Sequence, residues 1–304
     1  MQQTWIKYLC DPFDKSNLRF FKIGKKRGNE IISGLLKSKS GHIYEIKNGV
    51  PIFATSKTQS TESVDSFAYE WKTFDFDFGK ASWLRDVIRP SIGSRKYFKD
   101  KVVIDCGAGS GRQSLWMAES GAKFVFSVEL SDSAFLMIPR VTSRYKNRVF
   151  VIQADIARLP INKKTAKIDT AYCVNVIQHT KNPAKTLEEI SSLLGSKSQL
   201  IFNIYLRRGG GMIIDAIQFL KKIIRKFPKA IINALSFSLA LILFIFKFRK
   251  ISFKEFWLEI YDLLGNHSFQ NFYTQKYLSK LLEKSKLKVI KNSYYVMLLE
   301  KLSS

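Results

Sequence analysis

Residues 102–131, VVIDCGAGSGRQSLWMAESGAKFVFSVELS, constrain the fold of this chain more than any other stretch. A short apolar run ends near Asp105, glycine then occupies every second position from Gly107 to Gly111, and a second apolar run ends at Glu129. Glycine permits positive φ and lets backbone N–H groups approach a ligand at the start of a helix. The stretch therefore predicts a strand, a ligand-binding turn, a helix and a second strand.

The alternation of strands and helices continues beyond this stretch. Further strands are expected in VFVIQAD, DTAYCVNV and QLIFNIYL, with helices in SAFLMIPRVTSRY and PAKTLEEISSLL, and two last strands in KLKVIKNSYYVMLLEKL. This order is typical of an α/β fold with a mostly parallel sheet and helices on both faces. Ligands of such sheets bind beyond the carboxyl ends of the strands.

Acidic residues follow the ends of three successive predicted strands. The nicotinamide fingerprint needs a third glycine where this chain has Arg112, which weakens a dinucleotide assignment. Asp105 could instead accept a hydrogen bond from the amino group of an amino-acid ligand, and Glu129 stands where α/β folds bind ribose hydroxyls. Asp155 and the backbone of Ile156 could meet an adenine edge. Together they indicate a pocket for an adenosyl amino acid.

From about residue 66 to 206 the chain resembles the class I S-adenosylmethionine-dependent methyltransferases, because DCGAGSG, VELS, ADIARLP and AYCVNVIQHTKNPAKTLEEISSLL occur in the family's order. The resemblance implies a doubly wound, mostly parallel, seven-stranded Rossmann-like sheet and S-adenosyl-L-methionine as cofactor. It also implies these cofactor-binding residues: Asp105, Gly107, Ala108, Gly109, Gly111, Glu129, Asp155, Ile156 and Asn175.

Structural roles for some of these residues stay open at this point. Asp105 could cap the following helix, and Glu129 could be an ordinary solvated acid. Cys106 and Cys173 are expected to be small buried apolar residues rather than nucleophiles, because no basic residue is placed to activate them.

Two histidines are candidate catalytic residues. His179 follows the fourth strand of the predicted domain, on the rim where an acceptor should arrive, and could deprotonate a hydroxyl. It could equally be a helix-start residue bonded to backbone. His267 resembles a histidine that, in part of the family, precedes a Thr-led helix together with an aromatic residue, and it could face the substrate from the opposite side. Tyr69 and Trp71 are expected either as a lid over the cofactor or as an aromatic plug between domains.

The chain is expected to divide into a β-rich unit at residues 1–56, a linker and aromatic lid segment at 57–98, and a methyltransferase domain at 99–304 with a helical insert at 209–265. The first unit carries Asn48-Gly49, a strong hairpin signal. It resembles a zinc-ribbon-like module found before some bacterial methyltransferases. The metal ligands are missing, since Cys10, Phe13, Lys37 and Ser40 stand where cysteine pairs are expected, and we predict no metal.

Residues 230–246 form an apolar run of about the shortest length that can span a bilayer. A single crossing would leave the last two strands on the wrong side of the membrane. The run is therefore expected to pack as a helical lid or to lie in the membrane interface, and we favour the interface because basic residues flank it on both sides.

Composition leaves several partners open. A formal charge of +25 favours an anionic partner such as a membrane surface, RNA or a phosphorylated substrate, although a bias towards lysine codons would also explain it. Three separated cysteines and no signal peptide indicate a reducing, cytoplasmic environment. We expect a methyltransferase acting on a small-molecule or lipid-linked saccharide acceptor near the inner membrane face. The alternatives are an RNA methyltransferase and a non-catalytic cofactor-binding scaffold.

Overall fold

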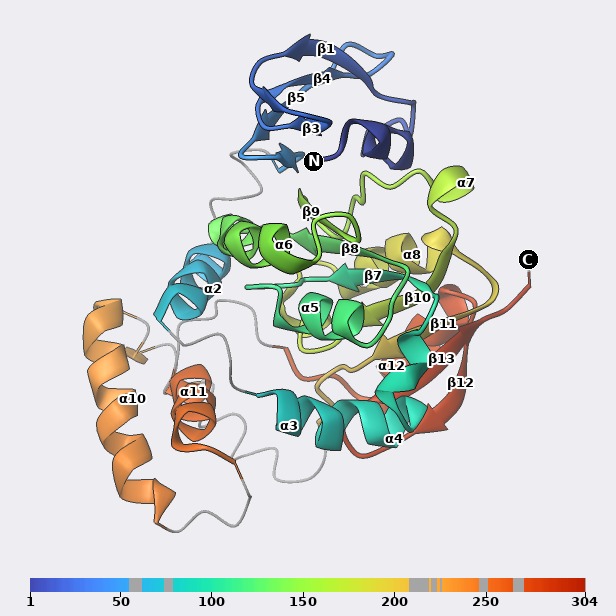
Figure 1. Ribbon diagram of the computed structural model, residues 1–304. Helices are drawn as coiled ribbons and strands as arrows, with labels where there is room; N and C mark the ends of the chain where they lie inside the picture. Colours follow the sequence, from blue (N-terminus) through green and yellow to red (C-terminus); the bar gives the residue numbers. More distant parts are fainter. Residues whose placement is uncertain are drawn as a thin grey trace.

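The protein is described by a computed structural model. It describes residues 1–54, 62–73, 79–207, 219, 223–224, 226–245, 251–264 and 271–303. Figure 1 shows a central sheet with helices on both sides, a small β-rich part at the amino-terminal end, and two helices that stand apart on one flank.

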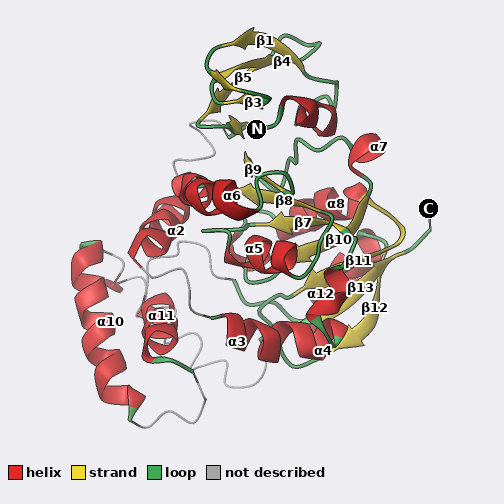
Figure 2. Cartoon of the chain, viewed as in Figure 1, coloured by secondary structure: helices red, strands yellow, loops and turns green. Residues whose placement is uncertain are grey.

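An eleven-stranded mixed sheet forms the centre of the molecule, in the order β1-β4-β5-β6-β9-β8-β7-β10-β11-β13-β12 (Figure 2). Strands β6, β9, β8, β7, β10 and β11 run parallel, and β13 and β12 complete one end antiparallel. The α/β fold and the last two strands are thus confirmed. Their bounds are β7 (Val102–Cys106), β8 (Phe124–Glu129), β9 (Val149–Gln153), β10 (Ile168–Cys173), β11 (Leu194–Phe202), β12 (Leu287–Asn292) and β13 (Met297–Lys301).

The predicted count of seven strands is too low for the sheet as a whole, because strands of the amino-terminal part extend it. Ile52 of β6 pairs with Gln153 of β9, and the Phe53 N–H donates to the Gln153 carbonyl over 2.7 Å. The amino-terminal strands are β1 (Arg19–Ile23), β2 (Lys26–Arg27), β3 (Glu30–Ile31), β4 (Gly34–Lys37), β5 (Ile43–Lys47) and β6 (Val50–Ile52), of which β2 and β3 form a separate pair.

Alternate residues of the parallel strands feed two separate cores, because successive side chains of a strand point to opposite faces. Ile104 and Phe126 lie in one core with α8 and α12, whereas Val103 and Val125 lie in the other with α5. The main helices are α2 (Glu62–Thr73), α3 (Lys80–Ser82), α4 (Arg89–Ile92), α5 (Arg112–Glu119), α6 (Ile138–Arg144), α7 (Lys163–Ala166), α8 (Pro183–Leu193), α10 (Lys229–Phe244), α11 (Phe253–Leu264) and α12 (Gln275–Lys284).

Short helical turns of other kinds complete the described elements. A π-helical segment, η2, joins α3 to α4, and the remaining turns are 3₁₀ helices. Their bounds are η1 (Gln3–Tyr8), η2 (Trp83–Ile88), η3 (Arg95–Phe98), η4 (Asp132–Met137) and η5 (Ile177–His179).

The amino-terminal part shares its core with the rest of the protein. The Trp5 ring lies 4.8 Å from that of Phe150 and 5.2 Å from that of Phe124. The predicted hairpin at Asn48-Gly49 is confirmed, since β5 and β6 pair antiparallel around it and both turn residues have positive φ. A shared sheet and a shared core hold this part against β9.

The insert contributes α10 and α11, which lie side by side at the flank of the molecule (Figure 1). Tyr261 of α11 is fully buried and packs with Ile232 of α10 and with Tyr69 of α2. In the part of the chain that the structure describes, no helix has the length and apolarity needed to cross a membrane.

Candidate functional site

The glycine turn lies between β7 and α5, and a carboxylate holds it in place. Its three glycines all have positive φ, and the N–H of Gly109 donates to Glu129 Oε2 over 2.8 Å. The other carboxylate oxygen, Glu129 Oε1, accepts the N–H and the hydroxyl of Ser131 over 2.9 and 2.7 Å. Glu129 is therefore not an ordinary solvated acid, because it ties the turn to the end of β8.

Asp105 lies under the turn and faces α5. It is 2% exposed, and its Oδ2 accepts the hydroxyl of Ser114 over 2.6 Å. Burial raises the pKa of Asp105 to about 7, the hydrogen bond from Ser114 offsets part of this rise, and the nearby charge of Glu129 adds to it. A positive charge placed close to a buried carboxyl with a raised pKa stabilises its ionised form.

The other predicted cofactor residues lie at the same edge of the sheet. Asp155 follows β9 and its Oδ1 accepts the Ala157 N–H over 2.8 Å, while the next residue, Ile156, is buried. Asn175 follows β10, has a φ of 63° and is exposed. The buried Ala108 donates its N–H to the Val128 carbonyl over 2.9 Å.

This arrangement fits the amino-acid and ribose ends of S-adenosylmethionine. Glu129 presents a carboxylate at the end of β8, which suits hydroxyl donors, and Asp105 presents a buried carboxyl that a cationic group would stabilise. Asp155 belongs to the neighbouring strand end. These residues would hold the cofactor at the carboxyl edge of the parallel strands.

Helix α2 covers the glycine turn. A Cβ built on Gly109 would lie only 2.7 Å from Trp71 Cε2, and the Arg112 guanidinium lies 4.8 Å from the centre of the Trp71 ring. Tyr69 of the same helix stacks on Tyr261 of α11, with ring centres 6.4 Å apart. Trp71 therefore lies where a lid was expected, with Tyr69 between α2 and the insert.

A group of ionisable residues is buried beneath α2. Glu70 is 2% exposed, and burial together with the neighbouring carboxylate of Asp262 raises its pKa well above the usual range, while Arg112 acts in the opposite direction. Burial lowers the pKa of Arg112, and the carboxylates around it raise it. This cluster joins α2, α5 and α11 at one point.

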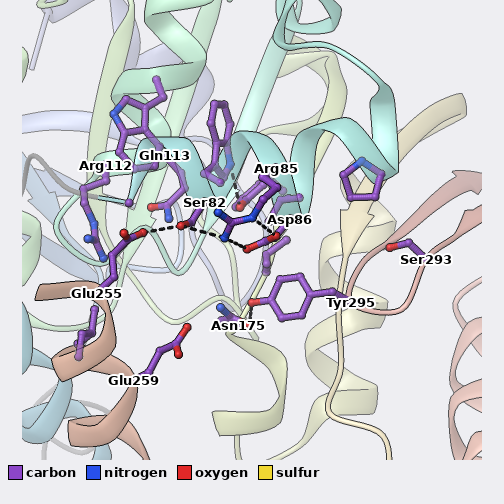
Figure 3. A pocket seen from close by; sticks show the side chains of 18 of the residues that line it. Ser82, Arg85, Asp86, Arg112, Gln113, Asn175, Glu255, Glu259, Ser293 and Tyr295 are labelled. Atoms are coloured by element: carbon purple, nitrogen blue, oxygen red, sulfur yellow. Dashed lines mark hydrogen bonds and ion pairs between the residues drawn. The ribbon is translucent and has the colours of Figure 1, made fainter. Parts of the chain in front are cut away.

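A cavity of about 700 Å³ opens beside the turn (Figure 3). Arg112 and Gln113, the first residues of α5, form one wall, and Asn175 at the end of β10 forms another. The remaining walls come from the α3–α4 segment, from α11 and from the loop between β12 and β13. The volume is in the range of small-molecule sites.

Polar and aromatic groups are mixed in this cavity. Ser82 donates to Glu255 Oε1 over 2.6 Å, and Arg85 pairs with Asp86 over 2.8 Å. The Tyr295 hydroxyl donates to Asn175 Oδ1 over 2.6 Å. Trp83 and Trp116 supply ring surfaces, 5.4 Å apart. Figure 3 shows Glu259 projecting from α11 towards this space.

Of these lining residues, sequence reasoning singled out Asn175 but missed Glu255 and Glu259, although one signal for the two glutamates was present. Glu255 and Glu259 are four residues apart, so they share one face of α11. Burial raises the pKa of Glu255, but hydrogen bonds from Ser82 and Ser252 outweigh it and hold the pKa below its usual value. Both glutamates line the cavity.

Of the two candidate catalytic histidines, the structure describes only His179. His179 is not among the described residues that line the cavity; its ring lies 6.0 Å from that of Tyr205, in an edge-on arrangement. His267 lies outside the described residues. Cys106 and Cys173 are fully buried, and burial raises the pKa of Cys173 to about 12, as expected for inert thiols.

Where the amino-terminal part was expected to have lost a zinc site, Asp11 organises the loop. This residue is 0% exposed, and its Oδ1 accepts the Phe13 N–H over 2.7 Å while its Oδ2 accepts the Tyr44 hydroxyl over 3.0 Å and contacts His42 Nδ1 at 2.7 Å. Cys10 beside it is buried. Among the described residues, no three His, Cys, Asp or Glu side chains are grouped so that they could hold a metal ion.

Comparison with known proteins identifies the central part of the chain. Residues 104–202 match a family described as a methyltransferase domain. A tRNA U34 carboxymethyltransferase of Ruthia magnifica is 26% identical over 245 residues, which are 68% of this chain and 72% of that protein. Protein arginine N-methyltransferase 1 of Oryza sativa subsp. indica is 33% identical over 122 residues, which are 37% of this chain and 30% of that protein.

Among solved structures, magnesium protoporphyrin IX methyltransferase from Synechocystis, with bound S-adenosylhomocysteine, aligns with a TM-score of 0.44 at 16% identity. The alignment covers 83% of this chain and 89% of that one.

Proposed function

We propose that this chain, which belongs to the class I S-adenosylmethionine-dependent methyltransferases, methylates a small-molecule or lipid-linked saccharide bound in the cavity beside the glycine turn, at the cytoplasmic face of the membrane. The observation that carries the proposal is the position of this cavity. Its walls include the first two residues of α5 and Asn175, so an acceptor there would lie next to the cofactor edge.

The lining of the cavity supports a saccharide acceptor. Glu255 and Glu259 offer carboxylate oxygens for hydroxyl groups, and Trp83 and Trp116 contribute apolar surface to the wall. A volume of about 700 Å³ suits a sugar unit or a molecule of similar size.

The chain's own residues would position the acceptor and receive its proton. Bound S-adenosylmethionine supplies the methyl group. The protein mainly has to hold the acceptor oxygen in line with it, since orientation accounts for much of such catalysis. Glu259, which projects towards the cavity, is the proposed general base, with His179 as the alternative.

The test combines labelled cofactor with fractions of the cell's own extract. We expect label to enter a lipid or glycan fraction. Once an acceptor is isolated, Glu259→Gln should lower kcat by about 100-fold, the usual effect of losing a general base, with unchanged affinity for S-adenosylmethionine. A larger loss in His179→Ala than in Glu259→Gln would assign the base to His179, and incorporation into RNA alone would refute the saccharide acceptor.

RNA is the second candidate acceptor. Two observations favour it: the similarity to tRNA U34 carboxymethyltransferases and the net charge of +25. If tRNA is the substrate, the protein should bind it with an affinity that falls steeply as salt rises, because each phosphate contact releases counterions. Weak binding that does not depend on salt would eliminate this candidate.

A further inference from the structure

Helix α10 packs against the protein through one narrow stripe. Ile232, Ser236 and Ala240 are its buried residues and recur every four positions, so they lie on one face. On that side, the Trp257 indole of α11 donates to Ser236 Oγ over 3.1 Å. The small side chains of Ser236 and Ala240 let the two helices approach closely.

The outer face of α10 is apolar, although the exposed face of a soluble helix is ordinarily polar. Leu241 is 57% exposed, Ile242 62% and Ile245, just after the helix, 82%. Ile231 and Leu235 are exposed as well. The helix contains no acidic residue from Lys229 to Phe244. We call this surface, defined by Ile231, Leu235, Leu241, Ile242 and Ile245, the outer face of α10.

We propose that the outer face of α10 docks on an anionic phospholipid bilayer, with the helix lying in the plane of the interface. Charge complementarity favours this partner: Lys226 and Lys254 are exposed near the two ends of the helix, and the chain carries a net charge of +25. In sequence, lysine or arginine also occupies 221, 222, 225, 247, 249 and 250. Basic residues beside an apolar surface favour contact with anionic headgroups.

Two acidic residues of α11 lie away from this face. Glu255 and Glu259 of α11 line the cavity together with Leu258, on the same helix that α10 packs against. The two-helix insert thus joins the bilayer face to the acceptor cavity. Resting on the proposed function, this geometry favours an amphiphilic acceptor whose polar group enters the cavity while its lipid chain stays in the bilayer.

Vesicle flotation of the full chain tests the docking surface. We expect the protein to float with phosphatidylcholine vesicles that contain phosphatidylglycerol and to bind pure phosphatidylcholine vesicles at least about 10-fold more weakly. The double variant Leu241→Glu/Ile242→Glu should lose binding to the anionic vesicles by about 100-fold or more, since it removes buried apolar area and adds repulsive charge.

The matched control is Phe21→Glu/Ile43→Glu, which alters two side chains of similar exposure, 53% and 52%, in the amino-terminal strands. It should float like the parent protein. Equal losses in both double variants, or no flotation of the parent, would overturn the inference. A third result would also overturn it: a parent protein that does not bind vesicles but forms a dimer, which Leu241→Glu/Ile242→Glu converts to monomers. The outer face of α10 would then bind a second copy of the chain.

Calorimetry with S-adenosylmethionine in the absence of vesicles separates this inference from the proposed function. Both double variants should bind the cofactor like the parent, since neither pair contacts the glycine turn. Failure of the parent to bind the cofactor would count against the methyltransferase proposal and would leave the vesicle result as an independent measurement of the surface.

Discussion

Two buried aspartates, Asp11 in the amino-terminal part and Asp105 under the glycine turn, have pKa values shifted in opposite directions. Burial raises the pKa of both. In Asp11 the hydrogen bonds from Phe13, His42, Ser38 and Tyr44 outweigh it and hold the pKa below 3.8. Asp105 has Ser114 as its hydrogen-bond partner and the charge of Glu129 nearby, and its pKa rises to about 7.

This comparison shows how an acidic residue that stabilises the fold can be distinguished from one that binds a ligand. Asp11 has its charge satisfied by hydrogen bonds from the surrounding protein, as expected where a side-chain network organises a loop. Asp105 has fewer hydrogen-bond donors around it, and it lies at the edge of the sheet where a ligand carrying an amino group is expected. Stability measurements should therefore respond to Asp11, and ligand binding should respond to Asp105.

The largest effect is expected for Asp11→Ala. This change removes the acceptor of several buried donors, and unfolding free energy should fall by about 4 kcal/mol. Affinity for S-adenosylmethionine should not change. Denaturant titration and calorimetry measure the two quantities, and Glu45→Ala, at an exposed position of β5, is the control, for which we expect little change in stability. If stability is unaffected in Asp11→Ala, the network is not structural.

Asp105→Asn should change how stability depends on pH. A carboxyl with a higher pKa in the folded chain contributes stability below its unfolded pKa of 3.8, and this contribution is lost as pH rises to about 7. Asp105→Asn has no carboxyl to ionise, so it does not lose stability in this way. The unfolding free energy of the variant minus that of the parent should therefore increase by at most about 3 kcal/mol from pH 5 to pH 8. Parallel pH curves for the two proteins would contradict the raised pKa.

Glu129→Gln should mainly weaken cofactor binding. The amide has only one acceptor oxygen, so either the Gly109 N–H or the Ser131 donors lose their acceptor, and the charge that favours ribose hydroxyls is lost. We expect an affinity for S-adenosylmethionine about 30-fold lower, or about 2 kcal/mol. Isothermal calorimetry measures it. Glu119→Gln, which alters an acid paired with Lys80 on the surface, should bind like the parent.

The smallest expected effect is the change with pH in the affinity for S-adenosylmethionine. If the cofactor's ammonium group is stabilised by ionised Asp105, affinity should rise by up to about 10-fold between pH 6 and pH 8, since the acid ionises near pH 7. In Asp105→Asn this rise should disappear. A rise of the same size in both proteins would assign the dependence to another group.

The parts of the fold that repeat local rules could be predicted from the sequence. Alternation of apolar runs and helical periods gave the parallel sheet, and Asn48-Gly49 gave a hairpin, because both depend on residues close in sequence. The edge formed by Asp105, Glu129 and Asp155 also follows from strand ends alone.

The cavity and the loop around Asp11 depend on contacts distant in sequence, and this limits prediction. Tyr295 meets Asn175 across 120 residues, and His42 meets Asp11 across 31. Arg112 illustrates the difficulty, because in sequence it only breaks a glycine pattern, whereas in the fold it lies beneath Trp71 and lines the cavity. No periodicity encodes such pairings.

The pairing of β6 with β9 also affects how readily the protein aggregates. If the parallel strands ended at β9, this apolar strand would expose a row of unpaired N–H and carbonyl groups. An exposed edge strand of this kind can pair with other chains and cause aggregation. The Ile52–Gln153 pair covers the end of β9, and Trp5 packs on Phe150, so residues 1–54 reduce the exposure of this edge. A protease cut that released them should turn a dispersed protein into one that precipitates.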